Sequence, residues 1–360
     1  MTWPLHGANP QHLYKELGIL EPEEILDFSV NTNSFGSPFQ PRNYVDLIET
    51  SISHYPNPNA TGLKEKISTE EQLSEEQILI GNGGSECIFL LANYFNGKNV
   101  CIIEPTFGEY RKACSTYNCK IESYVLKEEN NWDICFDEIY DFIVKNDVVF
   151  ICHPNNPTGI TYSIPKLLTI IKTAQKHDTV CVVDEAFYDF SKESIKLSSY
   201  INEFSNLVIL RSLTKMYSIP GLRLGYILAH QEIIKQLKPF QPPWSVNGLA
   251  QAIGALVLDE KEFVKETKTK VEKARVQLLQ ELRGLEYYVS DSKANFFILR
   301  DKNEMKDLND LIVFLLQNGI VPRHTYNFMG LNGKYIRLGI KKDEENAKLV
   351  DALSRWKNRC

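Results

Sequence analysis

The stretch Ile209–Gly225, ILRSLTKMYSIPGLRLG, is the most informative part of the chain. A short apolar run leads to Lys215, with the hydroxyl residues Ser212 and Thr214 just before it. Arg223 follows eight residues after the lysine. Two hydroxyls and a guanidinium can bind a phosphate, while the amine can form an imine with an aldehyde. The alternative is an ordinary surface lysine after a strand, so the interpretation depends on the rest of the chain.

Composition limits the classes of protein to which the chain can belong. Its 360 residues suit two modest domains or one large and one small domain, and 43% of them are hydrophobic. The net charge of -6 and the scattered Lys and Arg residues give no basic surface for nucleic acid. No apolar stretch approaches the roughly 20 residues that span a bilayer, and the N-terminus has no signal-peptide pattern. We therefore expect a cytoplasmic protein with no nucleic-acid or membrane partner.

The eight cysteines form no C-x-x-C pair. Several, such as Cys101 and Cys181, lie inside apolar runs. This pattern is typical of reduced core cysteines in a cytoplasmic protein, and it predicts neither disulfides nor a metal site.

Strand-like and helical patterns alternate in the middle of the chain. Continuous apolar runs, typical of strands buried on both faces, occur at 78–80, 99–103, 147–152, 179–184 and 207–210. Helical patterns follow two of them, at 87–92 and 164–177. The sequence therefore predicts an α/β fold with a mostly parallel sheet flanked by helices.

The character of the sequence changes after residue 251. A long charged helix is predicted over 255–283, followed by a strand at 295–299, a helix near 307–317 and a strand at 335–340. We expect a smaller α+β domain here. The predicted organisation is an N-terminal arm associated with the small domain (1–40), a large domain (41–250) and a small C-terminal domain (251–360).

Three motifs follow expected strands, at the edge where open parallel sheets bind ligands. Gly81–Glu86 (GNGGSE) can bring backbone N–H groups to a phosphate, although a plain turn fits it equally well. Phe107, in EPTFGEY, can stack on a flat ring or belong to the core. In Pro154–Gly159 (PNNPTG), two prolines fix the turn around Asn156, whose side chain can then donate a hydrogen bond to a ring oxygen.

Two charged residues lie in apolar surroundings and need partners. Asp184 ends the run at 182–184 and could face a protonated pyridine nitrogen or form a structural salt bridge. Arg337, in YIRL, could bind a substrate carboxylate or form a buried structural pair. Together with Lys215, these motifs predict pyridoxal phosphate as a cofactor.

With these motifs in this order, the chain resembles fold-type I pyridoxal phosphate enzymes of the class I and II aminotransferase family over nearly its full length. The resemblance implies a fold-type I large domain, a smaller α+β domain and a homodimer. It implies that Lys215 carries the cofactor, Asp184 faces its ring nitrogen, Asn156 faces its 3-oxygen and Phe107 stacks on its ring. The residues implied to hold the cofactor phosphate are Gly84, Ser85, Ser212, Thr214 and Arg223.

The resemblance also assigns residues to the substrate and to the partner subunit. Tyr55, in HYPNP, resembles the tyrosine that reaches the cofactor phosphate of the partner subunit. Arg337 would bind the substrate carboxylate. The candidates for the other end of a small phosphorylated amino acid or amine are Arg323, His6, Asn9 and Asn33. Arg323 could instead be a solvated loop residue.

Local motifs separate two branches of the family. The segments HGAN (6–9), LDFSVNTN (26–33), RSLTK (211–215) and PWSVN (243–247) resemble the branch that decarboxylates L-threonine O-3-phosphate in cobalamin biosynthesis. Phe187 also stands where the aminotransferases usually have a tyrosine. We therefore expect a decarboxylase of a phosphorylated amino acid. The alternatives are an aminotransferase, such as a histidinol-phosphate aminotransferase, and a non-catalytic protein that binds pyridoxal phosphate.

Overall fold

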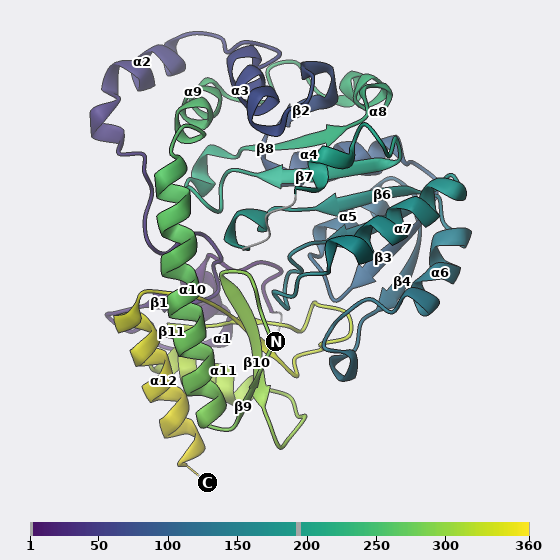
Figure 1. Ribbon diagram of the computed structural model, residues 1–360. Helices are drawn as coiled ribbons and strands as arrows, with labels where there is room; N and C mark the ends of the chain where they lie inside the picture. The colour runs from purple at the N-terminus through teal and green to yellow at the C-terminus, as the bar shows by residue number, and fades with distance from the viewer. Residues whose placement is uncertain (1–2, 192–195, 360) are drawn as a thin grey trace.

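The larger part of the molecule is built around a seven-stranded sheet (Figure 1). The structure is a computed structural model that describes residues 3–191 and 196–359. In spatial order, the strands are β2 (Ile78–Gly81), β8 (Gly225–Ala229), β7 (Leu207–Ser212), β6 (Val180–Asp184), β5 (Val148–Cys152), β3 (Asn99–Glu104) and β4 (Lys120–Val125). Strands β3 to β7 pair in parallel, whereas β8 runs antiparallel to both of its neighbours. The mostly parallel sheet predicted from the sequence is confirmed.

Alternate residues of the central strands enter two hydrophobic cores, one on each face of the sheet. In β5, Val149 and Ile151 belong to one core, and Val148 and Phe150 belong to the other. Helices cover both faces: α6 (Phe136–Lys145) and α7 (Ile164–Lys176) on one, and α4 (Gly83–Tyr94), α5 (Glu109–Thr116) and α8 (Gln231–Leu237) on the other. Because side chains alternate along a strand and both faces are covered, the strand sequences are continuously apolar.

A four-stranded antiparallel sheet forms the smaller part of the molecule, in the lower half of Figure 1. In spatial order, its strands are β12 (Arg323–His324), β13 (Ile336–Gly339), β10 (Phe296–Asp301) and β9 (Tyr287–Val289). A separate parallel pair joins β1 (Leu26–Asp27) to β11 (Ile320–Val321), so the N-terminal segment packs with the C-terminal part. The domain limits at residues 40 and 250 stay predictions.

The remaining helices surround these sheets, and one of them runs along both parts of the molecule. They are α1 (Pro10–Leu17), α2 (Val45–Ser53), α3 (Thr61–Glu71), α9 (Gly248–Val257), α10 (Lys261–Gly284), α11 (Asn309–Gln317) and α12 (Asp343–Lys357). Helix α10 extends from beside the large sheet to beside the small one (Figure 1).

Several elements differ from the sequence-based prediction. The single helix predicted over 255–283 is wrong, because α9 and α10 are separate helices with a break at 258–260. That break contains no glycine or proline, so the sequence carries no stop signal there. Six strands were not predicted. They are β4, an edge strand whose residues are partly exposed, β8, which begins at Gly225, and the short strands β1, β9, β11 and β12.

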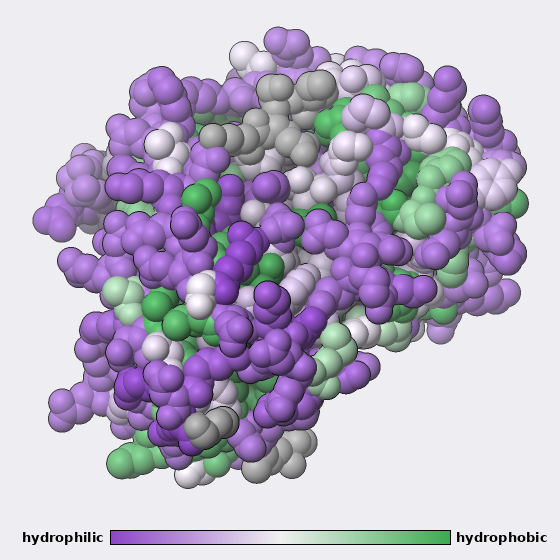
Figure 2. All heavy atoms as spheres, turned by 60° about the horizontal axis from the view of Figure 1, so that its bottom comes forward, coloured by the Kyte–Doolittle hydropathy of each residue, from purple (hydrophilic) through white to green (hydrophobic). Residues whose placement is uncertain are grey.

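The surface and the cysteines can be described directly from the structure. The face shown in Figure 2 consists mainly of hydrophilic residues, with small and separate hydrophobic patches. No helix within residues 3–191 and 196–359 is both long enough and apolar enough to cross a bilayer. The seven cysteines in these ranges are free, and six of them are buried. Cys360 lies outside the described residues.

Candidate active site

Lys215 lies three residues beyond the end of β7, at the sheet edge where β5 and β6 also end. Its backbone oxygen accepts a hydrogen bond from the backbone N–H of Asn33 at 2.9 Å. Its Nζ lies 5.9 Å from the centre of the Phe187 ring. The pKa of Lys215 is lowered to about 8, first by burial and then by the positive charges of Arg337 and Arg223. A large share of this amine is therefore neutral and nucleophilic near pH 8.

Asp184 is the last residue of β6, and its side chain is buried at the same edge. Tyr110 Oη donates a hydrogen bond to its Oδ2 at 2.5 Å, and the backbone N–H of Ala186 donates to its Oδ1 at 2.9 Å. Burial raises the pKa of Asp184, while these hydrogen bonds and the charge of Lys215 oppose the increase. A cation held against this carboxylate would keep it ionised.

The sequence analysis missed Tyr110. Its ring meets the ring of Phe107 edge to face, with the ring centres 6.0 Å apart. The signal was its position three residues after Phe107, because the turn before α5, closed by a hydrogen bond from the Tyr110 N–H to the Phe107 oxygen at 3.3 Å, brings the two residues close together. Phe107 itself follows the end of β3 and is only partly buried, so it is available to a ligand at this edge.

The hydroxyl groups predicted to hold a phosphate lie next to each other. Ser212 Oγ and Thr214 Oγ1 are 2.9 Å apart. Gly225 lies opposite Ser212 in β8, and a Cβ atom on Gly225 would come within 2.8 Å of the backbone nitrogen of Gly84. The hydroxyls and the glycine turn are therefore neighbours across two strands, and only glycine permits this approach.

Arg223 lies against the same glycine turn. A Cβ atom on Gly83 would come within 2.6 Å of Arg223 Nη2, and the φ of +81° at Gly83 also favours glycine. Gly84 and Ser85 follow in the first turn of α4, where backbone N–H groups have no partner within the helix. The five predicted phosphate ligands thus lie in or beside one turn, and Gly83, which was not predicted as a ligand, also belongs to that turn.

Arg337 extends from β13 of the small sheet toward the loop after β5. Its Nη1 donates to Asn156 Oδ1 at 2.6 Å, and its Nη2 donates to the backbone oxygen of Ser29 at 2.6 Å. Within the part of the chain that the structure describes, Nε of Arg337 has no hydrogen-bond partner. Because Asn156 uses its oxygen here, its Nδ2 remains the atom that can donate to a ligand.

Arg323 lies directly opposite Arg337 in the antiparallel pair of β12 and β13. It is buried rather than solvated, which excludes the loop alternative. Its Nη2 donates to the backbone oxygen of Leu5 at 2.6 Å and to Asn327 Oδ1 at 2.8 Å. Burial lowers the pKa of Arg323 to about 9, with a further contribution from Arg337, and burial lowers the pKa of Arg337 to about 10. Among the described residues, neither guanidinium forms an ion pair with a carboxylate.

The other predicted substrate residues differ in their surroundings. His6 is exposed on the N-terminal arm, with Nε2 at 3.1 Å from Glu109 Oε1. Asn9 is exposed at the start of α1. Asn33 is buried, and its side chain is already bonded to the backbone oxygen of Met216 at 3.0 Å, to Thr267 Oγ1 at 3.3 Å and to the backbone N–H of Phe35 at 2.9 Å. These bonds suit a residue that supports the loop of Lys215 better than one that binds a substrate.

Tyr55 lies apart from the other predicted ligands. Its side chain is 86% exposed, and its ring lies 5.5 Å from that of Trp244. Such a position gives it no contact with the phosphate ligands of its own chain, which agrees with a role toward another chain.

The gathered residues fit pyridoxal phosphate. Asp184 is a buried carboxylate that suits a ring N–H, and Lys215 is a partly neutral amine that suits an aldehyde. The turn beside Arg223 leaves no room for a Cβ atom at Gly83, and it leads into the N-terminus of α4, where free backbone N–H groups suit a phosphate. Within residues 3–191 and 196–359, no group of three or more His, Cys, Asp or Glu residues is placed to hold a metal ion.

Comparison with known proteins gives relatives over most of the chain. The model of the family "Aminotransferase class I and II" matches residues 23–353. The chain is 32% identical to the threonine-phosphate decarboxylase of Salmonella typhimurium, covering 97% of this chain and 95% of the relative. It is 32% identical to the adenosylcobalamin biosynthesis bifunctional protein CobDQ of Leptospira interrogans over 98% of this chain, but it spans only 41% of that longer protein.

Solved structures show the same fold. The histidinol-phosphate aminotransferase of Clostridium acetobutylicum matches with a TM-score of 0.87 and 30% identity, covering 93% of this chain and 100% of the solved chain.

We expect the cofactor-free protein to react with pyridoxal phosphate faster as the pH rises through about 8. Lys215 is protonated below that pKa and neutral above it, and only the neutral amine attacks an aldehyde. Stopped-flow absorbance over a pH series measures this rate. Borohydride treatment followed by peptide mapping should place the label on Lys215, and the Lys215→Ala variant should give no label there. A midpoint near the ordinary 10.5, or a label on another lysine, would contradict the assignment.

We expect Asp184→Asn to lower turnover of the loaded enzyme roughly 100-fold, because an amide cannot hold a proton on a ring nitrogen by charge. Tyr110→Phe is the matched control, since it removes one hydrogen bond from the same carboxylate and leaves the charge. Tyr110→Phe should lower turnover roughly tenfold, and the pKa of Asp184 should rise further in this variant. Steady-state kinetics of both variants test the role, which near-wild-type turnover by the Asn variant would refute.

Proposed function

This chain belongs to the aminotransferase class I and II family, and on that premise we propose that it is a pyridoxal phosphate enzyme that decarboxylates a small phosphorylated amino acid. L-Threonine O-3-phosphate is the proposed substrate, because a threonine-phosphate decarboxylase is among the relatives that cover nearly the whole chain. The N-terminal and lysine motifs quoted above support the same branch.

The observation that carries this proposal is the pair of buried arginines in the small sheet. Arg323 and Arg337 face each other across β12 and β13, and neither is paired with a carboxylate in the described part of the chain. Like charges directly opposite each other destabilise a sheet, and an unpaired buried charge is costly. A substrate with two anionic ends, a carboxylate and a phosphate, would bring negative charge to both guanidiniums, whose present hydrogen bonds go to neutral groups.

The residues at the edge of the large sheet would hold the cofactor. Asp184 would keep a proton on the ring nitrogen, Phe107 would pack on the ring, and Asn156 would donate from Nδ2 to the ring oxygen. The phosphate would be held by the set Gly84, Ser85, Ser212, Thr214 and Arg223. When bound, pyridoxal phosphate supplies an aldehyde for the substrate amine and a ring that withdraws electrons from the bond that breaks.

Lys215 would move the proton that completes the reaction. In decarboxylation, the bond between Cα and the carboxylate carbon breaks, CO2 leaves, and the Lys215 ammonium donates a proton to Cα. In amino transfer, the neutral Lys215 amine would instead remove the proton from Cα. The orientation that Arg337 and Arg323 impose on the substrate decides which bond is aligned for cleavage.

Amino transfer is the second candidate, favoured by the likeness to a solved histidinol-phosphate aminotransferase. Histidinol phosphate carries a phosphate but no carboxylate. It would therefore neutralise only one end of the arginine pair, which is why decarboxylation ranks first.

We also propose a cytoplasmic homodimer in which Tyr55 of one chain reaches the cofactor phosphate in the other. The exposure of Tyr55 supports this, as does α2, which has no buried residue and exposes Val45 and Ile52. An apolar helix face of this kind is typical of an interface between subunits.

We expect CO2 release from L-threonine O-3-phosphate but not from threonine, because only the phosphate ester neutralises both arginines. Arg323→Ala should lower kcat/KM on the order of 100-fold. Arg355→Ala, which removes an exposed arginine paired with Asp351, is the matched control and should leave kcat/KM unchanged. Radiolabelled CO2 capture measures the reaction, beside a glutamate-dependent assay with histidinol phosphate. Transamination without CO2 release would move the protein to the aminotransferase branch.

We expect a mixture of two inactive variants, Lys215→Ala and Tyr55→Ala, to regain activity after subunit exchange. In the mixed dimer, one site combines an intact Lys215 with the intact Tyr55 of the other chain. Activity should approach about a quarter of wild type at equal amounts, since half of the dimers are mixed and each holds one complete site. Size-exclusion chromatography with light scattering checks the dimer. A fully active monomer, or no recovery despite exchange, would refute the shared site.

A further inference from the structure

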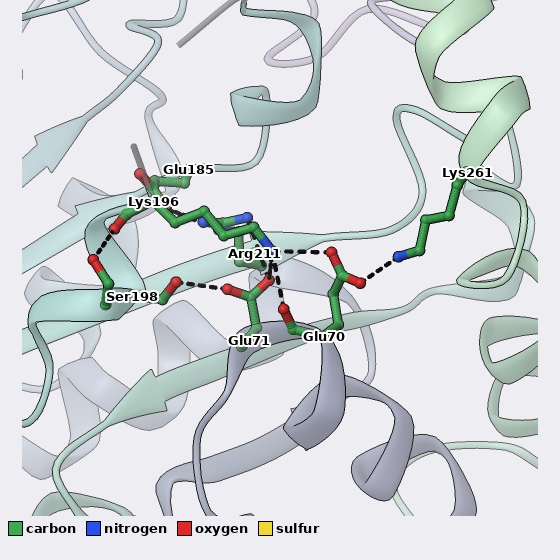
Figure 3. A network of polar contacts seen from close by, with 8 residues as sticks. Glu70, Glu71, Glu185, Lys196, Ser198, Arg211 and Lys261 are labelled. Carbon is green, nitrogen blue, oxygen red and sulfur yellow. Dashed lines mark hydrogen bonds and ion pairs between the residues drawn. The ribbon is translucent and has the colours of Figure 1, made fainter. Parts of the chain in front are cut away.

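A buried ion pair joins the two residues next in sequence to Asp184 and Ser212, and Figure 3 shows the polar network around it. Arg211 precedes Ser212 in β7, and Glu185 follows Asp184 at the end of β6. Arg211 Nε donates a hydrogen bond to Glu185 Oε2 at 2.8 Å, and its Nη2 lies 2.7 Å from the same oxygen. The side chains are 5% and 1% exposed. The pair therefore ties the ends of two neighbouring parallel strands together out of contact with water.

Further groups enclose this pair. The Tyr188 ring lies beneath the guanidinium, at 4.1 Å from its central carbon. Glu71, from α3, places Oε1 at 3.8 Å from Arg211 Nη1 and accepts a hydrogen bond from Ser198 Oγ at 2.6 Å. Figure 3 shows the network continuing outward through Lys196 and Glu70 to Lys261 of α10.

The side chain of Arg211 lies on the opposite face of the sheet from that of its neighbour Ser212. Successive side chains of a strand point to opposite faces, so Arg211 points away from the side of Ser212. The strand ends themselves are joined by the backbone hydrogen bond from Glu185 N–H to the Leu210 oxygen at 2.8 Å. A contact effect of Arg211 on a ligand at this edge would therefore pass through the backbone.

Stability alone does not account for this arrangement. A buried ion pair contributes little net stability, because desolvation cancels most of the attraction, whereas loss of one partner is strongly destabilising. Glu185 Oε1 has no hydrogen-bond partner among the described residues, and the pair with Arg211 is the main electrostatic support of this carboxylate, with a further contribution from His153. Burial raises the pKa of Glu185, and the positive charge of Arg211 opposes that increase.

We propose that Arg211 is a positioning residue: its pairing with Glu185 sets the spacing between Asp184 on β6 and the hydroxyls of Ser212 and Thr214 beyond the end of β7. Those groups are proposed to hold the two ends of the cofactor, its ring nitrogen and its phosphate, so this inference rests on the proposed function. Arg211 Nε donates the one hydrogen bond of the pair and Nη2 lies close to the same carboxylate oxygen, so the planar guanidinium fixes the direction of this contact, which a rotatable ammonium would not.

The test uses two ligands that share a ring and an aldehyde but differ at one end. Pyridoxal phosphate would contact both Asp184, through its ring nitrogen, and the hydroxyls of Ser212 and Thr214, through its phosphate. Pyridoxal lacks the phosphate and would contact Asp184 alone. Arg211→Lys keeps the charge but loses the fixed geometry. It should weaken binding of pyridoxal phosphate to the cofactor-free protein about tenfold and leave binding of pyridoxal unchanged. Absorbance titration measures both dissociation constants, and urea unfolding of the same samples measures stability.

The matched control is Lys261→Arg, another exchange of one cation for another, at the exposed outer end of the same network. It should change neither dissociation constant. Glu185→Asp shortens the acidic side chain and so disturbs the same ion pair. It should reproduce the Arg211→Lys result, so the test remains available if Arg211→Lys does not fold.

Two outcomes would overturn the inference. If Arg211→Lys and Glu185→Asp unfold at lower urea concentrations but bind both ligands as tightly as the wild type, Arg211 contributes to stability only. If the variants bind pyridoxal phosphate and pyridoxal more weakly by the same factor, the substitution has damaged the site as a whole. Failure of the wild-type protein to bind either ligand would instead refute the proposed function, so the two failures are distinguishable.

Discussion

The parallel pairing of β5, β6 and β7 is the constraint on which the rest of the structure depends. Because these strands run in one direction, the residues that follow them meet at a single edge of the sheet. Asn156, Asp184 and Lys215 are far apart in the chain but are brought together there. The strands can align in this way because helices cover both faces, and this cover is what makes each strand continuously apolar.

Burial at this edge gives the charged groups their chemistry. It lowers the pKa of Lys215 to about 8 and raises that of Asp184, so each group is moved toward its neutral form. Desolvation is the largest cause for both residues, and the neighbouring charges adjust the result. A site with these properties favours a ligand that restores the missing charge, and a positively charged ring N–H beside Asp184 meets that requirement.

The two sheets supply different parts of the site. The large sheet provides the residues proposed for the cofactor. The small sheet provides Arg323 and Arg337, which form no ion pair with a carboxylate of the described residues, although the charge of Asp27 acts on Arg337. Arg337 joins the two parts through Asn156, and Arg323 joins the small sheet to the N-terminal arm through the Leu5 oxygen. The proposed substrate would therefore be held where both sheets and the arm meet, and all three must be folded together for its two anionic ends to find partners.

The sequence by itself determined the fold class, the family and most residues at the edge of the large sheet, because each of these depends on a local pattern. Lys215, Asp184 and Asn156 are identifiable from the few residues around them. Tertiary structure alone decided the rest. The register that sets Arg323 against Arg337, the hydrogen bond from Tyr110 to Asp184, and the pairing of Arg211 with Glu185 each join distant segments. The direction of a side chain and its partner depend on how strands align and helices pack, and no local pattern of residues specifies that alignment.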